Sequence, residues 1–296
     1  MKLWFKYRIL LPCLSVLPQG LAYRLVSFSA RFVAEEHLAD TAVIQQQMQR
    51  VFEDKSAADI AQASDYFLGL IEREALDTFF FRRLHSIRQI DQFVRLENFD
   101  VILDARARGQ RVIISSGHFG RFWMAGVGMQ AHGVSVGTIT RDGGDFNEHG
   151  LPEQEYQYRL KKLRWLQACF GGPFLVEGDA IRPVYRALDE HVMALFIDVP
   201  YLDDKNGCIS LPFLGKMARF PLGAARMAKR SNAIIVPFYV FESRAGLCAR
   251  FYEPIVTADL TDAEIMQRLV ALLEAQIMAY PEQWWLWQAL PLLWQA

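Results

Sequence analysis

Short apolar runs alternate with longer segments of helical periodicity through the central and C-terminal parts of the chain. The runs predict strands at Val112–Ser116, Val134–Thr140, Phe174–Val176, Val192–Ile197, Cys208–Leu214, Ala233–Val240 and Leu247–Phe251. Helices are expected between them, at Arg121–Ala131, Glu153–Cys169, Ala180–Asp189, Leu222–Arg230 and Asp262–Ala279. Apolar strands separated by helices are typical of sheets covered on both faces. The pattern therefore predicts an α/β fold with a mixed sheet covered by helices.

The segment Ala34–Leu96 has helical periodicity and is predicted to be helical throughout. Ser56 and Asp59 have the spacing of a capping box, in which each residue's side chain bonds the other's backbone N–H at a helix start. Thr261 and Glu264 repeat this spacing before the last long helix. Two helix starts are therefore predicted from polar residues alone.

The first 33 residues combine cations with apolar side chains, and no acidic residue precedes Glu35. Arg8 and Arg24 bound an apolar stretch that Pro12 and Pro18 interrupt, so it falls short of the roughly 20 apolar residues of a spanning helix. We expect a helical, membrane-associated segment on the lipid surface, where cations meet anionic head groups. A buried helical hairpin and a cleaved signal peptide are the alternatives. The predicted organisation is a membrane-interfacial segment, residues 1–33, followed by one α/β domain, residues 34–296.

Composition narrows the possible partners. With 296 residues and 52% hydrophobic content, the chain can bury a full core. A formal net charge of −1 argues against a nucleic-acid partner, which usually needs a basic face. The four cysteines are far apart and have no zinc-ligand spacing, which indicates reduced thiols.

Candidate chemistry lies where predicted strands end. His118 follows the buried strand Val112–Ser116, Arg141 follows the next strand, and Asp198 follows Val192–Ile197. Open α/β sheets bind ligands at the carboxyl ends of their strands. An arginine at that edge suits a phosphate, because the guanidinium group offers paired donors in a fixed geometry.

Several other chemistries lack their motifs. The sequence has no G-x-S-x-G elbow for a serine hydrolase, and no G-x-G-x-x-G or Walker motif for a nucleotide cofactor. Asp142, Asp145, Glu148 and His149 form an acidic cluster that could hold a metal ion, but a solvated loop is the preferred interpretation. We therefore expect no metal site.

Longer stretches of the sequence resemble one family. These are SSGHFGRFW around His118, VGTITRDG through Arg141, RPVYRALDEHVMALFIDVP through Asp198, NGCISLPFLGKMARFPLGAARMAKRSNAIIVPFYV and YPEQWWLWQ. They are similar to the lysophospholipid acyltransferase superfamily, and most similar to the late acyltransferases of lipid A biosynthesis, the lauroyl/myristoyl type. The likeness extends from Leu11 to Trp287.

The resemblance implies a glycerolipid acyltransferase-like fold and a membrane-associated acyltransferase. The acyl donor would be a thioester of acyl carrier protein or coenzyme A, serving as co-substrate without a further cofactor. The acceptor would be a hydroxyl of a lipid or glycolipid. The expected location is the cytoplasmic face of the inner membrane. His118 would act as the general base, without an acyl-enzyme, which requires an imidazole in the correct tautomer.

The sequence departs from the family at one position. The family motif HxxxxD/E supplies an acid that holds the histidine, but Trp123 stands at that position, and no carboxylate occurs between His118 and Asp142. A backbone carbonyl, or a carboxylate from elsewhere such as Asp198 or Glu177, could orient His118 instead. Two alternatives follow from the missing acid: a non-catalytic relative that binds lipid or acyl carrier protein, and an acyltransferase for an aromatic or polyene acceptor.

The resemblance also implies roles for further residues. Arg141 and Arg121 would contact the anionic group of the acceptor. Phe213, Leu214 and Gly215 would lie near the acyl or acceptor groove, with Lys216 at its mouth. The predicted substrate-binding set is Arg121, Trp123, Arg141, Asp198, Phe213, Gly215 and Lys216.

Overall fold

The computed structural model describes residues 3–36, 38–81, 86–140, 151–178, 181–200, 207–243 and 245–294. The described strands are β1 (Val94–Glu97), β2 (Val112–Ser116), β3 (Val136–Thr140), β4 (Gly171–Val176), β5 (Val192–Phe196), β6 (Cys208–Phe213), β7 (Lys216–Pro221), β8 (Ile234–Ser243) and β9 (Gly246–Phe251). Seven of these strands form one sheet in the order β1-β9-β8-β2-β5-β3-β4, and β6 and β7 form a separate hairpin. Within the seven-stranded sheet as described, the β8–β9 pair is antiparallel and the other pairs are parallel.

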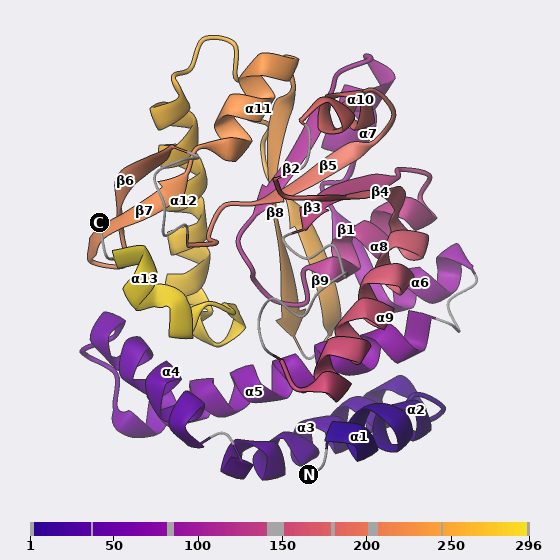
Figure 1. Ribbon diagram of the computed structural model, residues 1–296, viewed down its shortest axis with the longest axis vertical. Coiled ribbons are helices and arrows are strands. Elements are labelled where there is room, and N and C mark those ends of the chain that lie inside the picture. The colour runs from indigo at the N-terminus through magenta and orange to yellow at the C-terminus, as the bar shows by residue number, and fades with distance from the viewer. Residues whose placement is uncertain are drawn as a thin grey trace.

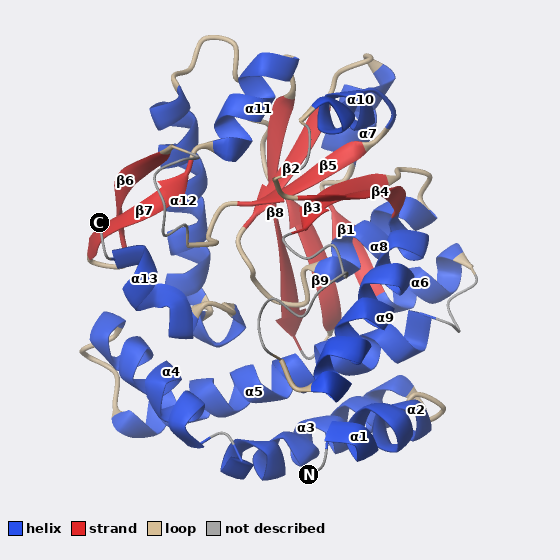
Figure 2. Ribbon diagram, in the orientation of Figure 1, coloured by secondary structure: helices blue, strands red, loops and turns tan. Residues whose placement is uncertain are grey.

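The described helices are α1 (Leu3–Phe5), α2 (Leu11–Leu14), α3 (Gln19–Glu36), α4 (Leu38–Val51), α5 (Ala57–Phe80), α6 (Ile87–Phe93), α7 (Asp100–Ala107), α8 (Trp123–Ala131), α9 (Glu153–Phe170), α10 (Arg182–Glu190), α11 (Gly223–Ser231), α12 (Asp262–Ala279) and α13 (Leu290–Trp294). A short π-helix, Lys6–Leu10, joins α1 to α2, and 3₁₀ helices lie at Pro281–Gln283 and Trp287–Ala289. Figure 2 shows helices on both sides of the sheet.

Side chains of the central strands alternate between two cores. Ile113 of β2 and Leu195 of β5 face a core that α10, α11 and α12 cover. Val112 and Ile114 of β2 face a second core, formed with α7, α8 and α9. Successive residues of a strand point to opposite faces, so a strand buried on both faces is apolar at every position. The predicted α/β class, with its mixed and helix-covered sheet, is confirmed.

Two strands of the structure were not predicted from the sequence, β1 and β7. β1 overlaps the end of the segment Ala34–Leu96 that was predicted to be helical, and that prediction is wrong for Val94–Leu96. The strand has four residues and pairs with β9 at the sheet edge, so it is too short to leave a periodic signal. β7 was also missed, although its partner β6 was predicted; it pairs with β6 in antiparallel register.

The N-terminal helices lie together along one end of the molecule, next to α5 (Figure 1). Ala22 and Val26 of α3 are buried against Leu76 of α5 in a third, smaller core. Leu25 and Phe28 of α3 remain exposed. The N-terminal segment is thus a packed helical layer with an apolar outer stripe. Within the described residues, none of the helices combines the length and the apolar character needed to cross a membrane.

Candidate active site

The strand register brings a histidine and a carboxylate together. β2 and β5 are parallel neighbours, and Ser116 pairs with Phe196. Two residues beyond that pair, His118 and Asp198 follow their strands at the same offset. The His118 Nδ1 atom lies 2.7 Å from Asp198 Oδ1, and the His118 backbone N–H donates to Asp198 Oδ2, also at 2.7 Å. A long-range strand pairing therefore supplies the carboxylate that the local motif lacks.

Gly117 allows this close approach. A Cβ atom at that position would lie 2.8 Å from Asp198 Oδ2 and 2.6 Å from a methyl group of Leu273. The carboxylate of Asp198 is fully buried, whereas the His118 side chain is 25% exposed. The imidazole therefore holds its buried face against Asp198 and presents the remainder to solvent.

The His118 ring is also held by aromatic neighbours. Its centroid lies 4.7 Å from the ring of Phe196 and 5.2 Å from the ring of Phe122. With Nδ1–H donated to Asp198, the Nε2 atom carries the lone pair of the neutral ring. This is the tautomer that a general base requires.

His118 opens into a cavity of about 870 Å³. Aliphatic side chains line its interior, among them Ile139 of β3, Leu175 of β4 and Ile197, which directly follows β5. Among the described residues, four cations also line it: Arg159 and Lys162 of α9, and Arg226 and Arg230 of α11. Apolar walls combined with a few polar groups are typical of sites for amphiphilic ligands.

The sequence matches the family of bacterial lipid A biosynthesis acyltransferases over residues 1–290. The chain belongs to that family. The predicted family is therefore confirmed, and the protein is a lipid acyltransferase. No curated protein matches the sequence at a significant level. Among solved structures, a 1-acyl-sn-glycerophosphate acyltransferase, PlsC, from Thermotoga maritima is similar, with 12% sequence identity and a TM-score of 0.40, covering 88% of this chain and 97% of that chain.

Trp123, at the position of the family acid, lines the cavity of the acyltransferase. Its ring lies 4.7 Å from Phe122 and 6.4 Å from Phe174, and the Lys162 ammonium group lies 5.6 Å from its centroid. The wall at this position is therefore aromatic and capped by a cation, where the family motif has a carboxylate.

Arg121 of the acyltransferase lies away from the cavity. Its side chain is 2% exposed, and its guanidinium group donates to Asp77 of α5 at 2.7 Å and to Glu242 of β8 at 3.2 Å. It also lies over the ring of Tyr23 of α3, 4.5 Å from the centroid. The predicted contact of Arg121 with the acceptor does not fit this placement, because the side chain is buried outside the cavity and pairs with two carboxylates.

The charges around Arg121 perturb one another. Burial raises the pKa of Asp77 to about 7, against the opposite pull of Arg121. Burial lowers the pKa of Arg121, but Asp77, Tyr23 and Glu242 together raise it above its usual value. Glu242 also pairs with Arg73, at 2.7 Å. This cluster ties α3 and α5 to the loop that carries His118.

Phe213, Gly215 and Lys216 lie in the β6–β7 hairpin and do not line the cavity. Leu214 and Gly215 have positive φ angles of 51° and 83°, as a two-residue hairpin turn requires. Phe213 is fully buried, and Lys216 lies over the Trp294 ring, 4.7 Å from its centroid. The hairpin packs on the C-terminal segment instead, so the structure does not bring these residues to the cavity beside His118.

Two other predictions have different outcomes. Asp198 was predicted to bind substrate, but its complete burial leaves it no surface to do so; the alternative, that it orients His118, fits the geometry. Arg141 and the acidic cluster Asp142–His149 lie outside the described residues.

The sequence reasoning missed the cationic cavity wall and the C-terminal partner of the site. Arg159, Lys162, Arg226 and Arg230 stand on ordinary amphipathic helices, so nothing local distinguishes them from solvated cations. Trp284 donates its indole N–H to Asp198 Oδ2 at 2.9 Å. Its only signal was its place in the YPEQWWLWQ stretch that contributed to the family resemblance.

Proposed function

We propose that this lipid acyltransferase moves an acyl chain from a thioester of acyl carrier protein or coenzyme A to a hydroxyl of a lipid or glycolipid. His118 is the general base, and the reaction uses no further cofactor. The observation that carries the proposal is the bond between His118 and the buried Asp198 at the wall of an apolar cavity lined by cations.

The chemistry is a direct transfer between two substrates. His118 Nε2 takes the proton of the acceptor hydroxyl while the hydroxyl oxygen attacks the thioester carbonyl. The C–O bond forms, the C–S bond breaks, and the imidazolium returns its proton to the departing thiolate. Asp198 stabilises the positive ring through Nδ1–H and keeps it in the reactive orientation. The balance requires no acyl-enzyme.

The cavity matches the substrates that this reaction needs. Ile139, Leu175 and Ile197 offer an apolar wall to an acyl chain. The cations of α9 and α11 suit the phosphate groups of a carrier-bound donor and of a phosphorylated lipid or glycolipid. Both substrates are amphiphiles with anionic head groups. A cavity with an apolar wall and a cationic wall can therefore hold both of them.

Asp198 removes the main reason for a non-catalytic interpretation. That alternative rested on the missing acid of the HxxxxD/E motif. A carboxylate 2.7 Å from Nδ1 can perform the same orienting task from a neighbouring strand. We therefore favour turnover over binding alone.

Substitutions of His118 and Asp198 test the proposal. Purified protein receives acyl-carrier-protein or coenzyme A thioester with lipid and glycolipid acceptors, and the acylated product is measured. His118→Ala should abolish transfer, and Asp198→Asn should reduce kcat by about 10³-fold or more, since the histidine of a serine protease loses about 10⁴-fold in the analogous change.

His132→Ala is the matched control. His132 also bonds a carboxylate, Asp91, at 2.9 Å, but on the surface and outside the cavity. Its replacement should leave turnover unchanged. Undiminished activity of His118→Ala would overturn the mechanism.

The N-terminal layer supports attachment to the cytoplasmic face of the inner membrane. Leu21, Leu25 and Phe28 form an exposed stripe along α3, with Arg24 exposed beside them, and Trp4 and Phe5 of α1 are also exposed. Apolar side chains next to cations are typical of helices that lie in a membrane interface. A surface-bound enzyme can take its acceptor from the lipid layer and its donor from solution.

An aromatic or polyene acceptor is the second candidate. The observation in its favour is the aromatic wall formed by Phe122, Trp123, Phe196 and Trp285 around the cavity. Conjugated substrates would stack on these rings. The test is a competition assay in which phospholipid and aromatic acceptors are present at equal concentration and both acylated products are measured. If no aromatic acceptor is acylated, this candidate is eliminated.

A further inference from the structure

The carboxylate of Asp198 receives hydrogen bonds from two distant parts of the chain. Its Oδ2 atom accepts from the His118 backbone N–H at 2.7 Å and from Trp284 Nε1 at 2.9 Å, and its Oδ1 atom faces His118 Nδ1. Asp198 and Trp284 are both fully buried. A carboxylate without solvent is stable only when donors compensate for its lost hydration, so each bond constrains its orientation.

The residues flanking Trp284 hold the same loop. The Gly120 N–H donates to Gln283 O at 2.7 Å, and the Trp285 N–H donates to His118 O at 2.9 Å. The Trp285 indole also donates to Gly120 O, at 2.7 Å. The segment Gln283–Trp285 therefore runs along the loop after β2 and bonds its backbone on both sides of Phe119.

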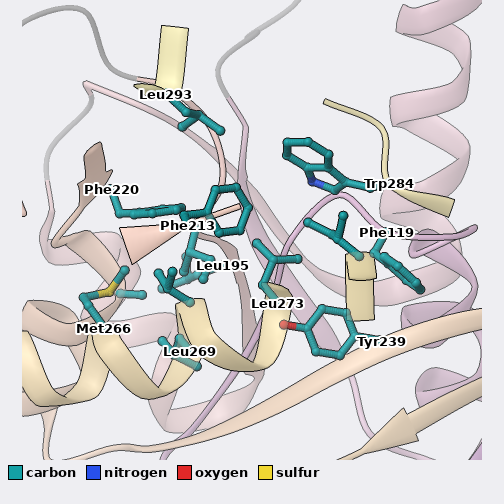
Figure 3. Packing of buried hydrophobic residues seen from close by; sticks show 14 of the residues in the cluster. Phe119, Leu195, Phe213, Phe220, Tyr239, Met266, Leu269, Leu273, Trp284 and Leu293 are labelled. Carbon is teal, nitrogen blue, oxygen red and sulfur yellow. The ribbon is translucent and has the colours of Figure 1, made fainter. Parts of the chain in front are cut away.

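Gly120 makes this arrangement possible. Its φ angle is +60°, and a Cβ atom there would lie 1.7 Å from the carbonyl oxygen of Val240. The loop thus turns sharply against β8 while its outer edge pairs with the C-terminal segment. Packing fixes the indole itself: Figure 3 shows Trp284 among Phe119, Phe213 and Leu273, and its ring centroid lies 5.9 Å from that of Phe213.

We infer that Trp284 is a positioning residue for the acyl transfer, and that its indole N–H fixes the Asp198 carboxylate in the rotamer that orients His118. The inference rests on the proposed role of His118 as the base. With Oδ2 held by Trp284 and the His118 backbone, Oδ1 is aimed at Nδ1. Trp284 does not line the cavity, so it acts through Asp198 and not on the substrate.

Removal of the indole donor should free the Asp198 carboxylate to rotate. Rotation lowers the population of the reactive geometry, in which Oδ1 faces His118 Nδ1.

Trp284→Phe removes the donor and retains most of the packing. We expect kcat to fall on the order of 10-fold with little change in either KM, because misorientation affects the reacting geometry more than ground-state binding.

Trp287→Phe is the matched control. Trp287 is equally buried, lies 5.0 Å from Trp284 in ring centroids, and also donates its indole N–H, to Pro281 O at 2.8 Å. Its substitution removes an indole donor and one hydrogen bond from the same core, but leaves the bond from Trp284 to Asp198 intact. It should leave kcat unchanged. Equal effects of the two substitutions would overturn the inference.

A double-mutant cycle separates positioning from general stability. If Trp284 acts through the Asp198 carboxylate, Trp284→Phe should have little further effect on kcat in the Asp198→Asn background. Equal losses in both backgrounds would assign Trp284 a structural role and reject the inference. Should Trp284→Phe fail to fold, site-specific incorporation of 3-benzothienylalanine keeps the ring shape and lacks only the donor.

The NMR resonance of the His118 Nδ1–H proton tests the inference without turnover. The chemical shift of this proton reports its hydrogen bond to Asp198, so it should change in Trp284→Phe and stay in place in Trp287→Phe. An unchanged resonance in Trp284→Phe would contradict the positioning role. If the wild-type protein transfers no acyl group but the resonance still changes in Trp284→Phe, the proposed function is rejected while the coupling of Trp284 to His118 stands.

Discussion

At the scale of single residues, burial separates two side chains that the sequence analysis had both assigned to the active site. His118 and Arg121 are three residues apart on one loop, yet one opens into the cavity and the other is enclosed by Asp77 and Glu242. The sequence identified His118 as the base because it follows a buried strand. It could not identify the environment of Arg121, because both partner carboxylates come from distant segments.

Arg121→Met tests the structural role of the arginine. The change leaves Asp77 and Glu242 short of a partner in a buried site, so the free energy of unfolding should fall by about 3–5 kcal/mol, measured by denaturant titration. Arg108→Met is the control, since Arg108 is exposed and donates to Gln110 alone among its described contacts; it should change stability by less than about 0.5 kcal/mol. If Arg121→Met is as stable as the wild type but has a raised KM for the acceptor, the structural role is contradicted and Arg121 belongs to the substrate site.

At the scale of elements, local signals predicted the boundaries well. α12 begins and ends where the periodicity placed it, and both predicted capping boxes are present, at Ser56–Asp59 and Thr261–Glu264. Helix caps depend on residues within one turn, so a single sequence contains the whole interaction. β1 failed as a prediction for the opposite reason, since pairing with β9 creates it.

Thr261→Ala should destabilise the protein through α12. The Thr261 hydroxyl accepts from the Glu264 N–H at 3.2 Å, and the Glu264 carboxylate accepts from the Thr261 N–H at 2.7 Å. Loss of the cap should lower the free energy of unfolding by about 1 kcal/mol. Thr261→Ser keeps the hydroxyl and should retain most of the stability; equal stability of the alanine variant and the wild type would show that the cap contributes nothing.

At the scale of the whole molecule, the N-terminal helices form a layer with a packed inner side and an exposed outer side. Its inner side packs on α5, and its outer side exposes apolar residues at one end of the fold (Figure 1). Tyr23 of α3 donates to Asp77 at 2.5 Å, and Asp77 binds Arg121 on the loop of His118. The proposed membrane-facing layer is therefore in direct contact with the support of the active site.

Leu25→Glu combined with Phe28→Glu should weaken membrane attachment. Both side chains are exposed on α3, so the change should preserve folding while it removes apolar area and adds negative charge near an anionic surface. Co-sedimentation with vesicles containing anionic phospholipid should show at least about a tenfold loss of binding. Val256→Glu, at a 61% exposed apolar residue outside the N-terminal helices, is the control and should bind as the wild type does. Undiminished binding of the double variant would rule out this stripe as the attachment surface.

The sequence by itself determined the α/β class, most strands and helices, the family and the place of His118 after a central strand. These features depend on periodicity, caps and contiguous motifs, which are properties of neighbours along the chain. Tertiary structure alone decided what holds His118. The pairing of β2 with β5 brings Asp198 to the imidazole, and the C-terminal segment adds Trp284. A strand's neighbour and register are set by packing across the whole sheet, so the sequence could offer Asp198 only as one of several candidates for the missing motif acid, and the folded protein selects it.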